Sequence, residues 1–184
     1  MTYDAIGNIL TVKDSKGTIK RTYDELNRVK SYTDYKGNTV KYSYDELGKL
    51  ISLTYPGGEI VRYKYYDNGY LHKVIDSDGR TTIYEYDAVG NLIKTTRPNG
   101  TVEERVYNEA YQLVEQIEKD EADKELSHLT YTYDKKGNIT KTEGYKESEE
   151  GISKLTSATM KYDKANRLIE YNGEEVKYDK NLYK

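Results

Sequence analysis

The feature that most constrains this chain is a tyrosine that recurs at an almost fixed interval. These leading tyrosines are Tyr3, Tyr23, Tyr44, Tyr65, Tyr86, Tyr107, Tyr133 and Tyr162, and the first five intervals are 20 or 21 residues long. So short a period indicates one supersecondary unit that is repeated and buries its face only against its neighbours. The sequence therefore predicts an array of repeats and not a compact enzyme domain.

Each repeat carries two turn signals. In the first, Asp45 follows Tyr44 and Gly48 stands four residues after that tyrosine, which is typical of a type I turn that closes a hairpin with a bulge. In the second turn, Pro56 and Pro98 occupy the second position, where φ near −65° is required. We assign the structural role in the repeat to Tyr3, Asp4, Gly7, Tyr23, Asp24, Tyr44, Asp45, Gly48, Tyr65, Gly69, Tyr86, Asp87, Gly90, Tyr133, Asp134, Gly137, Tyr162 and Asp163.

Between the turns lie segments of about six residues rich in Tyr, Thr, Val and Ile, which have strand length and strand composition. The predicted fold class is all-β: about eight antiparallel β-hairpin repeats that form one curved, open sheet. We expect a single array over residues 1–184, regular over 3–118 and irregular over 119–184. Tyrosines spaced by two should point to one face and form a ladder across the sheet.

Three departures from the pattern fall late in the chain. Tyr111 stands where the first turn expects Gly or Asn, so that turn is expected to differ. Inserts near 119–127 and 143–157 lengthen the next two intervals, and solvated hairpin loops are the expected outcome. The segment 118–129 could form one or two helical turns or a charged loop, and the sequence does not decide between them.

The composition excludes several classes of function. The 29 basic and 32 acidic residues are interspersed and give a net charge of −3, so nucleic acid is not an expected partner. The chain has no cysteine, and no apolar run approaches the roughly 20 residues that would span a bilayer. All 22 aromatic residues are tyrosines, which favours half-wet sheet faces over a thick, dry core.

Candidate catalytic and metal-binding residues are few. His72 falls at a strand position, and His128 has no evident partner at a suggestive spacing. The recurrent Asp that follows the leading tyrosine has a structural explanation, since its side chain accepts N–H bonds of its own turn. Residues 76–79 resemble the opening of a calcium loop but lack the distal ligands. We therefore predict no enzyme activity, no catalytic residue, no metal and no cofactor.

The motif Tyr-Asp followed by Gly-Asn-Leu or Asn-Arg-Leu resembles the RHS/YD-repeat family. The matching segments are 3–9, 86–92, 133–139 and 162–168, and the resemblance covers essentially the whole chain. It implies a sheet of hairpins that spirals into a hollow shell in bacterial secreted or wall-associated toxins, insecticidal toxin complexes and teneurins. The implied role is a non-catalytic part of a shell or stalk around an effector domain, outside the cell or at its surface.

The resemblance also sets the expected partners, namely the remainder of a parent RHS protein and its effector domain. The chain begins inside a repeat, so we expect a piece of a longer protein, whose exposed strand edges favour self-association. The alternative function is a carbohydrate-binding module of the cell surface. Its glycan contacts would be the tyrosine pairs Tyr42, Tyr44, Tyr63, Tyr65, Tyr84 and Tyr86.

Overall fold

The computed structural model describes residues 1–147 and 153–178, and every regular element in these ranges is a β-strand. The chain divides into two compact units, Met1–Ile83 and Tyr84–Lys184, which are described separately. The first unit holds strands β1 (Thr2–Tyr3), β2 (Ile9–Asp14), β3 (Gly17–Tyr23), β4 (Val29–Thr33), β5 (Thr39–Tyr44), β6 (Leu50–Thr54), β7 (Ile60–Tyr65) and β8 (Leu71–Ile75). Strand β9 (Thr81–Tyr86) includes the boundary between the units.

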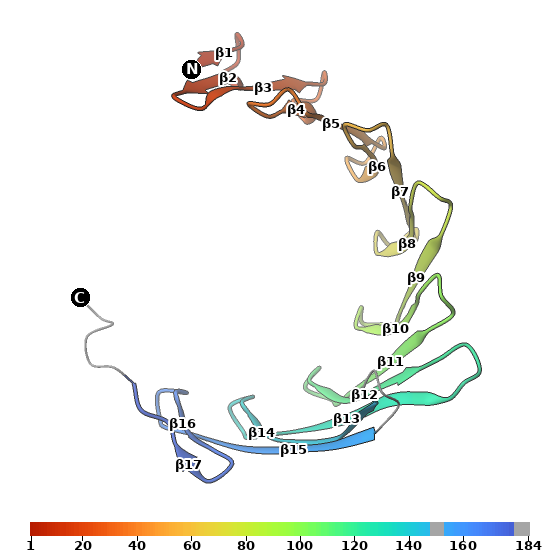
Figure 1. Cartoon of the computed structure of the whole chain (residues 1–184), viewed down its shortest axis with the longest axis vertical. Coiled ribbons are helices and arrows are strands. Elements are labelled where there is room, and N and C mark those ends of the chain that lie inside the picture. The colour runs from red at the N-terminus through yellow and green to blue at the C-terminus, as the bar shows by residue number, and fades with distance from the viewer. Residues whose placement is uncertain (148–152, 179–184) are drawn as a thin grey trace. The chain divides into compact units, whose positions relative to one another are not determined.

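The second unit holds the remaining described strands. They are β10 (Leu92–Thr96), β11 (Val102–Tyr107), β12 (Leu113–Lys119), β13 (Glu125–Tyr133), β14 (Ile139–Glu147), β15 (Ser153–Tyr162), β16 (Leu168–Tyr171) and β17 (Glu174–Glu175). The described strands form one open sheet of 17 antiparallel strands, in which each strand pairs with its neighbours in the chain. Within each unit the hairpins follow one another in chain order (Figure 1). The predicted all-β class and open antiparallel sheet are confirmed.

The first turn of each repeat is a four-residue turn with a bulge. In the repeat of Tyr44, the N–H of Gly48 donates to the carbonyl of Asp45 at 3.1 Å, and the N–H of Asp45 donates to that of Lys49 at 2.9 Å. The register then shifts by one residue between Ser43 and Tyr44. Gly48 has φ of +84°, a left-handed conformation that glycine adopts without steric cost.

The first turns lie at one end of the strands and the second turns at the other end, because antiparallel strands reverse direction at each turn. The turn that contains Pro56 has the N–H of Gly58 donating to the carbonyl of Tyr55 at 2.9 Å. Proline therefore stands where the chain needs its fixed φ and no N–H donor. No described helix is long and apolar enough to pass through a bilayer.

The register of Met1–Ile83 sorts its side chains onto two chemically different faces. The tyrosine face comprises Val12, Ile19, Arg21, Tyr23, Val29, Tyr32, Val40, Tyr42, Tyr44, Leu50, Leu53, Val61, Tyr63, Tyr65, Leu71, Val74 and Thr82. The opposite face carries Ser, Thr, Lys and Arg with a few isoleucines. No hydrophobic side chain among the described residues is buried, so each unit lacks a dry core.

Of the two alternatives left open for residues 118–129, the helical one is wrong. The segment 118–129 contains no helix: β12 continues to Lys119, a turn spans 120–124, and β13 begins at Glu125. The inserts, expected to form solvated hairpin loops, are mostly strand within the described residues, since they lengthen β13 and β14 to 9 residues each and β15 to 10. Residues 148–152 of the second insert lie outside the described ranges. Extending a hairpin satisfies the inserted backbone groups in the ladder.

The expectation of a different turn at Tyr111 is also wrong. Its N–H donates to the carbonyl of Asn108 at 2.9 Å, as the glycine of other repeats does. Tyr111 takes φ of +59°, and its side chain is 63% exposed, so it escapes the crowding of this conformation by pointing into solvent. The turn therefore holds Tyr111 in a left-handed backbone conformation that tyrosine rarely adopts.

Candidate functional site: the tyrosine face and the repeat turns

The hydroxyl of a leading tyrosine bonds to the backbone of the preceding repeat. Tyr44 donates to the carbonyl of Val29 at 2.9 Å, and Tyr65 donates to the carbonyl of Leu50 at 2.8 Å. The same bond joins Tyr23 to Ile9 at 3.0 Å, Tyr107 to Leu92 at 3.0 Å, and Tyr133 to Leu113 at 2.6 Å. Sequence reasoning missed this bond, although the constant tyrosine, never phenylalanine, is the signal that could have revealed it.

These bonds link successive repeats, and we call the series of bonds from leading tyrosines to the preceding repeat the tyrosine relay. Val29, whose carbonyl accepts from Tyr44, is the residue that pairs with the previous leading tyrosine, Tyr23. Leu50, which accepts from Tyr65, likewise pairs with Tyr44. Each leading tyrosine thus fixes the point at which the preceding hairpin resumes pairing after its bulge. The relay holds the turns of neighbouring repeats in register.

A cation covers the outer side of two of these rings. The guanidinium of Arg28 lies 4.7 Å from the ring centroid of Tyr44, and its Nη1 donates to the carbonyl of Asp45 at 2.9 Å. In the next repeat the ammonium of Lys49 lies 5.3 Å from the ring centroid of Tyr65. Such contacts contribute about 0.5–1 kcal/mol each when partly exposed. Burial raises the pKa of Tyr44 and Tyr65 above the ordinary 10.0, which keeps the donating hydroxyl protonated.

The aspartate after the leading tyrosine binds the backbone of its own turn. Asp87 Oδ1 accepts from the N–H of Val89 at 3.0 Å, Gly90 at 2.8 Å and Asn91 at 2.8 Å, while Oδ2 accepts from Asn91 Nδ2 at 2.7 Å. The carboxylates of Asp4, Asp24, Asp134 and Asp163 make the same kind of bonds. Asp45 accepts from the N–H of Lys49 at 2.8 Å. Each carboxylate is thus committed to its own turn.

Hydrogen bonds to these carboxylates favour their charged form. The side-chain amide of Asn91 lowers the pKa of Asp87 below 3.8, and backbone N–H bonds from Asn91 and Val89 lower it further. In the second turns, the side chain of Asn38 lowers the pKa of Asp34 in the same way, and the guanidinium of Arg80 lowers that of Asp76. A group held as a carboxylate at neutral pH in this manner does not suit a general acid.

Where a repeat departs from Tyr-Asp, the turn keeps its geometry by substitution. Asn108 replaces the aspartate, and its Oδ1 accepts from the N–H of Ala110 and Gln112 at 2.9 and 3.0 Å. Its own amide then donates to Gln112 Oε1 at 2.9 Å. In the repeat of Tyr65, Tyr66 stands in this place, and Asn68 takes over by accepting from the N–H of Tyr70 at 3.1 Å.

The tyrosine pairs predicted to contact glycans are Tyr42, Tyr44, Tyr63, Tyr65, Tyr84 and Tyr86, and all six are half-buried. The hydroxyls of Tyr44 and Tyr65 already bond to backbone, and a cation covers each ring. Among the tyrosines more exposed than these pairs are the turn residues Tyr35, Tyr55, Tyr70 and Tyr111 and the strand residues Tyr3 and Tyr171. The paired rings therefore present less free surface for stacking on a sugar than the sequence suggested.

The two histidines lie in strands and contact other side chains. His72 in β8 stacks on Tyr66 with ring centroids 4.2 Å apart. His128 in β13 does have a partner, contrary to the sequence expectation, since its Nε2 lies 2.7 Å from Glu115 Oε1. The Asp76 carboxylate accepts bonds from Asp78 and Arg80 and is thereby occupied. No cluster of His, Cys, Asp or Glu among residues 1–147 and 153–178 could hold a metal ion.

The second unit contains a charged cluster that the sequence did not signal. Glu103 in β11 is only 7% exposed and pairs with Arg97 at 2.6 Å and with Arg105. Arg97 also reaches Glu118 at 2.9 Å. Glu103 and Arg105 stand four and two residues before the leading Tyr107, where the repeat of Tyr44 has Val40 and Tyr42. The mutual pairing of these charges lets them replace apolar residues on a partly buried face.

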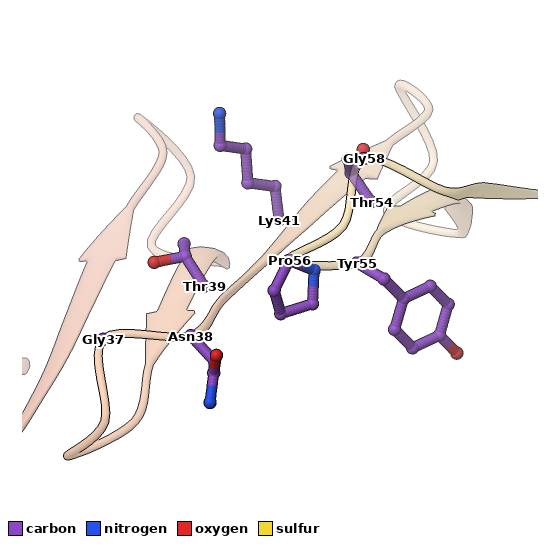
Figure 2. A pocket seen from close by; sticks show the side chains of 8 residues that line it. All are labelled: Gly37, Asn38, Thr39, Lys41, Thr54, Tyr55, Pro56 and Gly58. Atoms are coloured by element: carbon purple, nitrogen blue, oxygen red, sulfur yellow. The ribbon is translucent and has the colours of Figure 1, made fainter.

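Shallow hollows lie between neighbouring turns of the first unit. One of about 510 Å³ is lined by Gly37, Asn38, Thr39, Lys41, Thr54, Tyr55, Pro56 and Gly58 (Figure 2). Figure 2 shows these residues coming from two successive second turns and from the strands that follow and precede them. Another hollow, of about 460 Å³, includes Tyr63 and Tyr65 near the first turns. Neither contains a nucleophile beside a base.

Comparison with known proteins begins with the family models, one of which matches the most regular part of the array. Residues 23–60 and 65–102 match the model of the RHS Repeat. In these two segments the chain is similar to RHS repeats. The expected resemblance is thereby confirmed, and the two matched segments coincide with the tethered tyrosines Tyr23, Tyr44 and Tyr65. The comparison with curated proteins gave no match.

Solved structures show the same fold. The chain resembles a component of the crystal structure of TcdB2-TccC3-Cdc42 with a TM-score of 0.76 and 19% identity, over 90% of this chain and 9% of the other. The Photorhabdus luminescens Tc holotoxin pore with the TccC3 mutation D651A gives a TM-score of 0.75 with the same identity and coverage. The crystal structure of TcdB2-TccC3 matches at 0.64, over 92% of this chain. The chain thus spans about a tenth of the length of these proteins.

Proposed function

We propose that this RHS-repeat array is a non-catalytic structural segment in the wall of a shell or stalk that encloses or presents an effector domain. The observation that carries the proposal is the tyrosine relay, which uses one side chain per repeat to fasten each hairpin to the one before it. A wall must be continuous and uniform, and a repeated backbone bond provides both. The fold likeness to Tc toxin components supports this role.

The chemistry of the turns supports a role without catalysis. The recurrent carboxylates are committed to their own turns, and the charged cluster around Glu103 is internally paired. We further propose that the partners are the rest of the parent protein and its effector, and that the parent acts outside the cell. Both proposals draw on the Tc toxin complexes named in the solved structures.

The test removes one whole repeat, residues 45–65, from the full-length protein that carries this chain, because such a deletion preserves the phase of the turns. The effector should become accessible to added protease while its activity as a separate domain is unchanged. A matched control replaces Tyr35 with Phe in an exposed turn and should leave protection intact. Equal protease resistance of the effector with and without the deleted repeat would contradict the enclosing role.

A further inference from the structure

Charge in the first unit is separated by face, which the small net charge of the chain conceals. The strand residues opposite the tyrosine face in Met1–Ile83 include no acidic side chain. We call this surface the basic face; its charged residues are Lys13, Lys20, Lys41, Arg62, Lys64 and Lys73. The acidic residues of the unit lie in the connections between strands, apart from Asp14, which is the last residue of β2.

The cations of the basic face have no acidic partner. The salt bridges of residues 1–83 join Arg28 to Asp24 and Arg80 to Asp76 and Asp78, all within turns. Lys20, Lys41 and Arg62 are exposed to solvent. Unpaired cations gathered on one face repel one another, so an arrangement of this kind is satisfied by an external anion.

The corresponding surface of the second unit offers a contrast within the same chain. There Lys119 pairs with Glu104 at 3.0 Å, Lys141 with Glu143 at 2.6 Å, and Lys161 with Glu170 at 2.8 Å. These three lysines are therefore neutralised by the protein itself. The first unit has no ion pair of this kind on its basic face, so the repeat alone does not decide whether these lysines are paired.

Three of the free cations follow the repeat. Lys20, Lys41 and Arg62 each stand three residues before a leading tyrosine, on β3, β5 and β7. Alternate strands are about 10 Å apart, so the charges form a sparse row across the sheet. Hydroxyls lie between them: Ser31 and Thr54 pair directly with Lys41, and Ser52 pairs with Arg62.

The hollow in Figure 2 gives this row a binding point. It is lined by Lys41 together with Thr39 and Thr54, and it has a volume of about 510 Å³. A lysine ammonium can bind a carboxylate, while the threonine hydroxyls of the same hollow can hydrogen-bond to a neighbouring peptide group. The walls are turn backbone and Pro56, which leave the space open on the solvent side.

We propose that the basic face of Met1–Ile83 binds an extended acidic polypeptide. An extended chain places side chains on one side about every 7 Å. Glu side chains are flexible, so their carboxylates can reach cations that are about 10 Å apart. The hydroxyls of the serines and threonines on this face can hydrogen-bond to the backbone of the bound peptide. Duplex nucleic acid carries one charge about every 1.7 Å, and single strands use aromatic stacking, whereas all tyrosines of these strands lie on the opposite face. The proposal does not depend on the enclosing role.

The experiment measures binding of a fluorescein-labelled polyglutamate peptide to the whole chain by fluorescence anisotropy. The triple variant Lys20→Gln, Lys41→Gln, Arg62→Gln should bind about tenfold more weakly, because three unpaired charges are lost from one surface. The matched control Lys119→Gln, Lys141→Gln, Lys161→Gln makes the same change in net charge in the second unit and should bind as the parent chain does. Thermal unfolding verifies that both variants are folded.

Three outcomes would overturn the proposal. The first is absence of binding at low salt, and the second is equal weakening by the two triple variants. The third is a preference for another polymer: an oligonucleotide or a sulfated polysaccharide of the same total charge would displace the peptide at lower concentration than unlabelled polyglutamate does. A peptide preference with a loss confined to the first triple variant supports it.

Discussion

A tyrosine differs from a phenylalanine by one hydroxyl, and at the leading positions of this array that hydroxyl joins neighbouring repeats. The carbonyl that receives it lies beside a bulge, where the regular ladder is interrupted and backbone groups need other partners. An apolar ring at this place would pack equally well and leave the carbonyl without its donor. Hydrogen bonding therefore gives a reason why the leading position holds tyrosine and not phenylalanine.

Tyr44→Phe is expected to destabilise the chain by about 1 kcal/mol, because the carbonyl of Val29 loses its partner while the ring is retained. The melting temperature should fall by about 2–4 °C in a thermal unfolding experiment. Tyr35→Phe removes a hydroxyl from an exposed turn residue and should change stability by less than about 0.5 kcal/mol. Equal effects of the two substitutions would show that the relay does not contribute.

Stability should fall as the pH drops below about 4. Turn hydrogen bonds hold the pKa of Asp34, Asp87 and Asp134 below the ordinary 3.8, so the unfolded chain binds protons first. The contribution is complete above pH 3.8 and is lost as pH falls through the lower folded-state values. Urea unfolding midpoints measured from neutral to acidic pH check this.

The control for the pH experiment copies the natural substitution at Asn108. Replacing Asp34, Asp87 and Asp134 with Asn keeps an acceptor for the turn N–H groups and removes the titrating carboxylates. The triple variant should show a shallower loss of stability in acid. An unchanged dependence on pH would mean that other groups govern acid unfolding.

At the scale of the elements, the spacing of turn residues was enough to predict the strands and both kinds of turn. Hydrophobic alternation and Gly, Asn and Pro at fixed positions specify a hairpin locally, so these features could be predicted without a partner. The relay, the pairing of His128 with Glu115 and the cluster around Glu103 depend on residues brought together by register across strands. Tyr111 shows the limit of local reasoning, since the surrounding ladder overrides its conformational preference.

The long hairpin of β13 and β14 contains a position that excludes any side chain. Gly144 has φ of +142°, and a Cβ there would lie 2.8 Å from the carbonyl carbon of His128 and closer still to its oxygen. Gly144→Ala should therefore separate the two strands and cost more than about 2 kcal/mol. Urea unfolding of the variant, with hydrogen exchange of the β13 amides, measures the loss.

Gly37→Ala is the matched control for Gly144, because Gly37 has φ of +90° but open space around the added methyl group. It should cost only the backbone strain, about 1 kcal/mol. A cost for Gly144→Ala no larger than that of Gly37→Ala would show that the strands tolerate the added atom.

At the scale of the whole molecule, the chain has uncovered surfaces that favour association. No described apolar side chain is buried, and the outermost strands of the described sheet, β1 and β17, have two residues each. We predict that the isolated chain associates with itself through strand edges or through the tyrosine face. Light scattering after size exclusion, over a wide range of concentration, should show growth from monomer to dimer or larger species.

A charge placed on the tyrosine face distinguishes association through that face from association through strand edges. Val61→Lys puts an ammonium on the tyrosine face, opposite Leu53, and should abolish association through that face, while association through strand edges should persist. A monomer at every concentration would contradict both routes. The composition alone predicted the wet faces, but the sorting of charge onto one face appeared only once the register of each strand was known.

The direction of the tyrosine relay has a consequence for synthesis. Every tether runs backwards, from a tyrosine to a carbonyl 14 to 20 residues earlier in the chain. A hairpin that emerges from the ribosome therefore finds its docking point already made, and no repeat has to wait for a later one to be translated. The array can be completed one hairpin at a time in the order of its genetic message, with few distant contacts to be found by search.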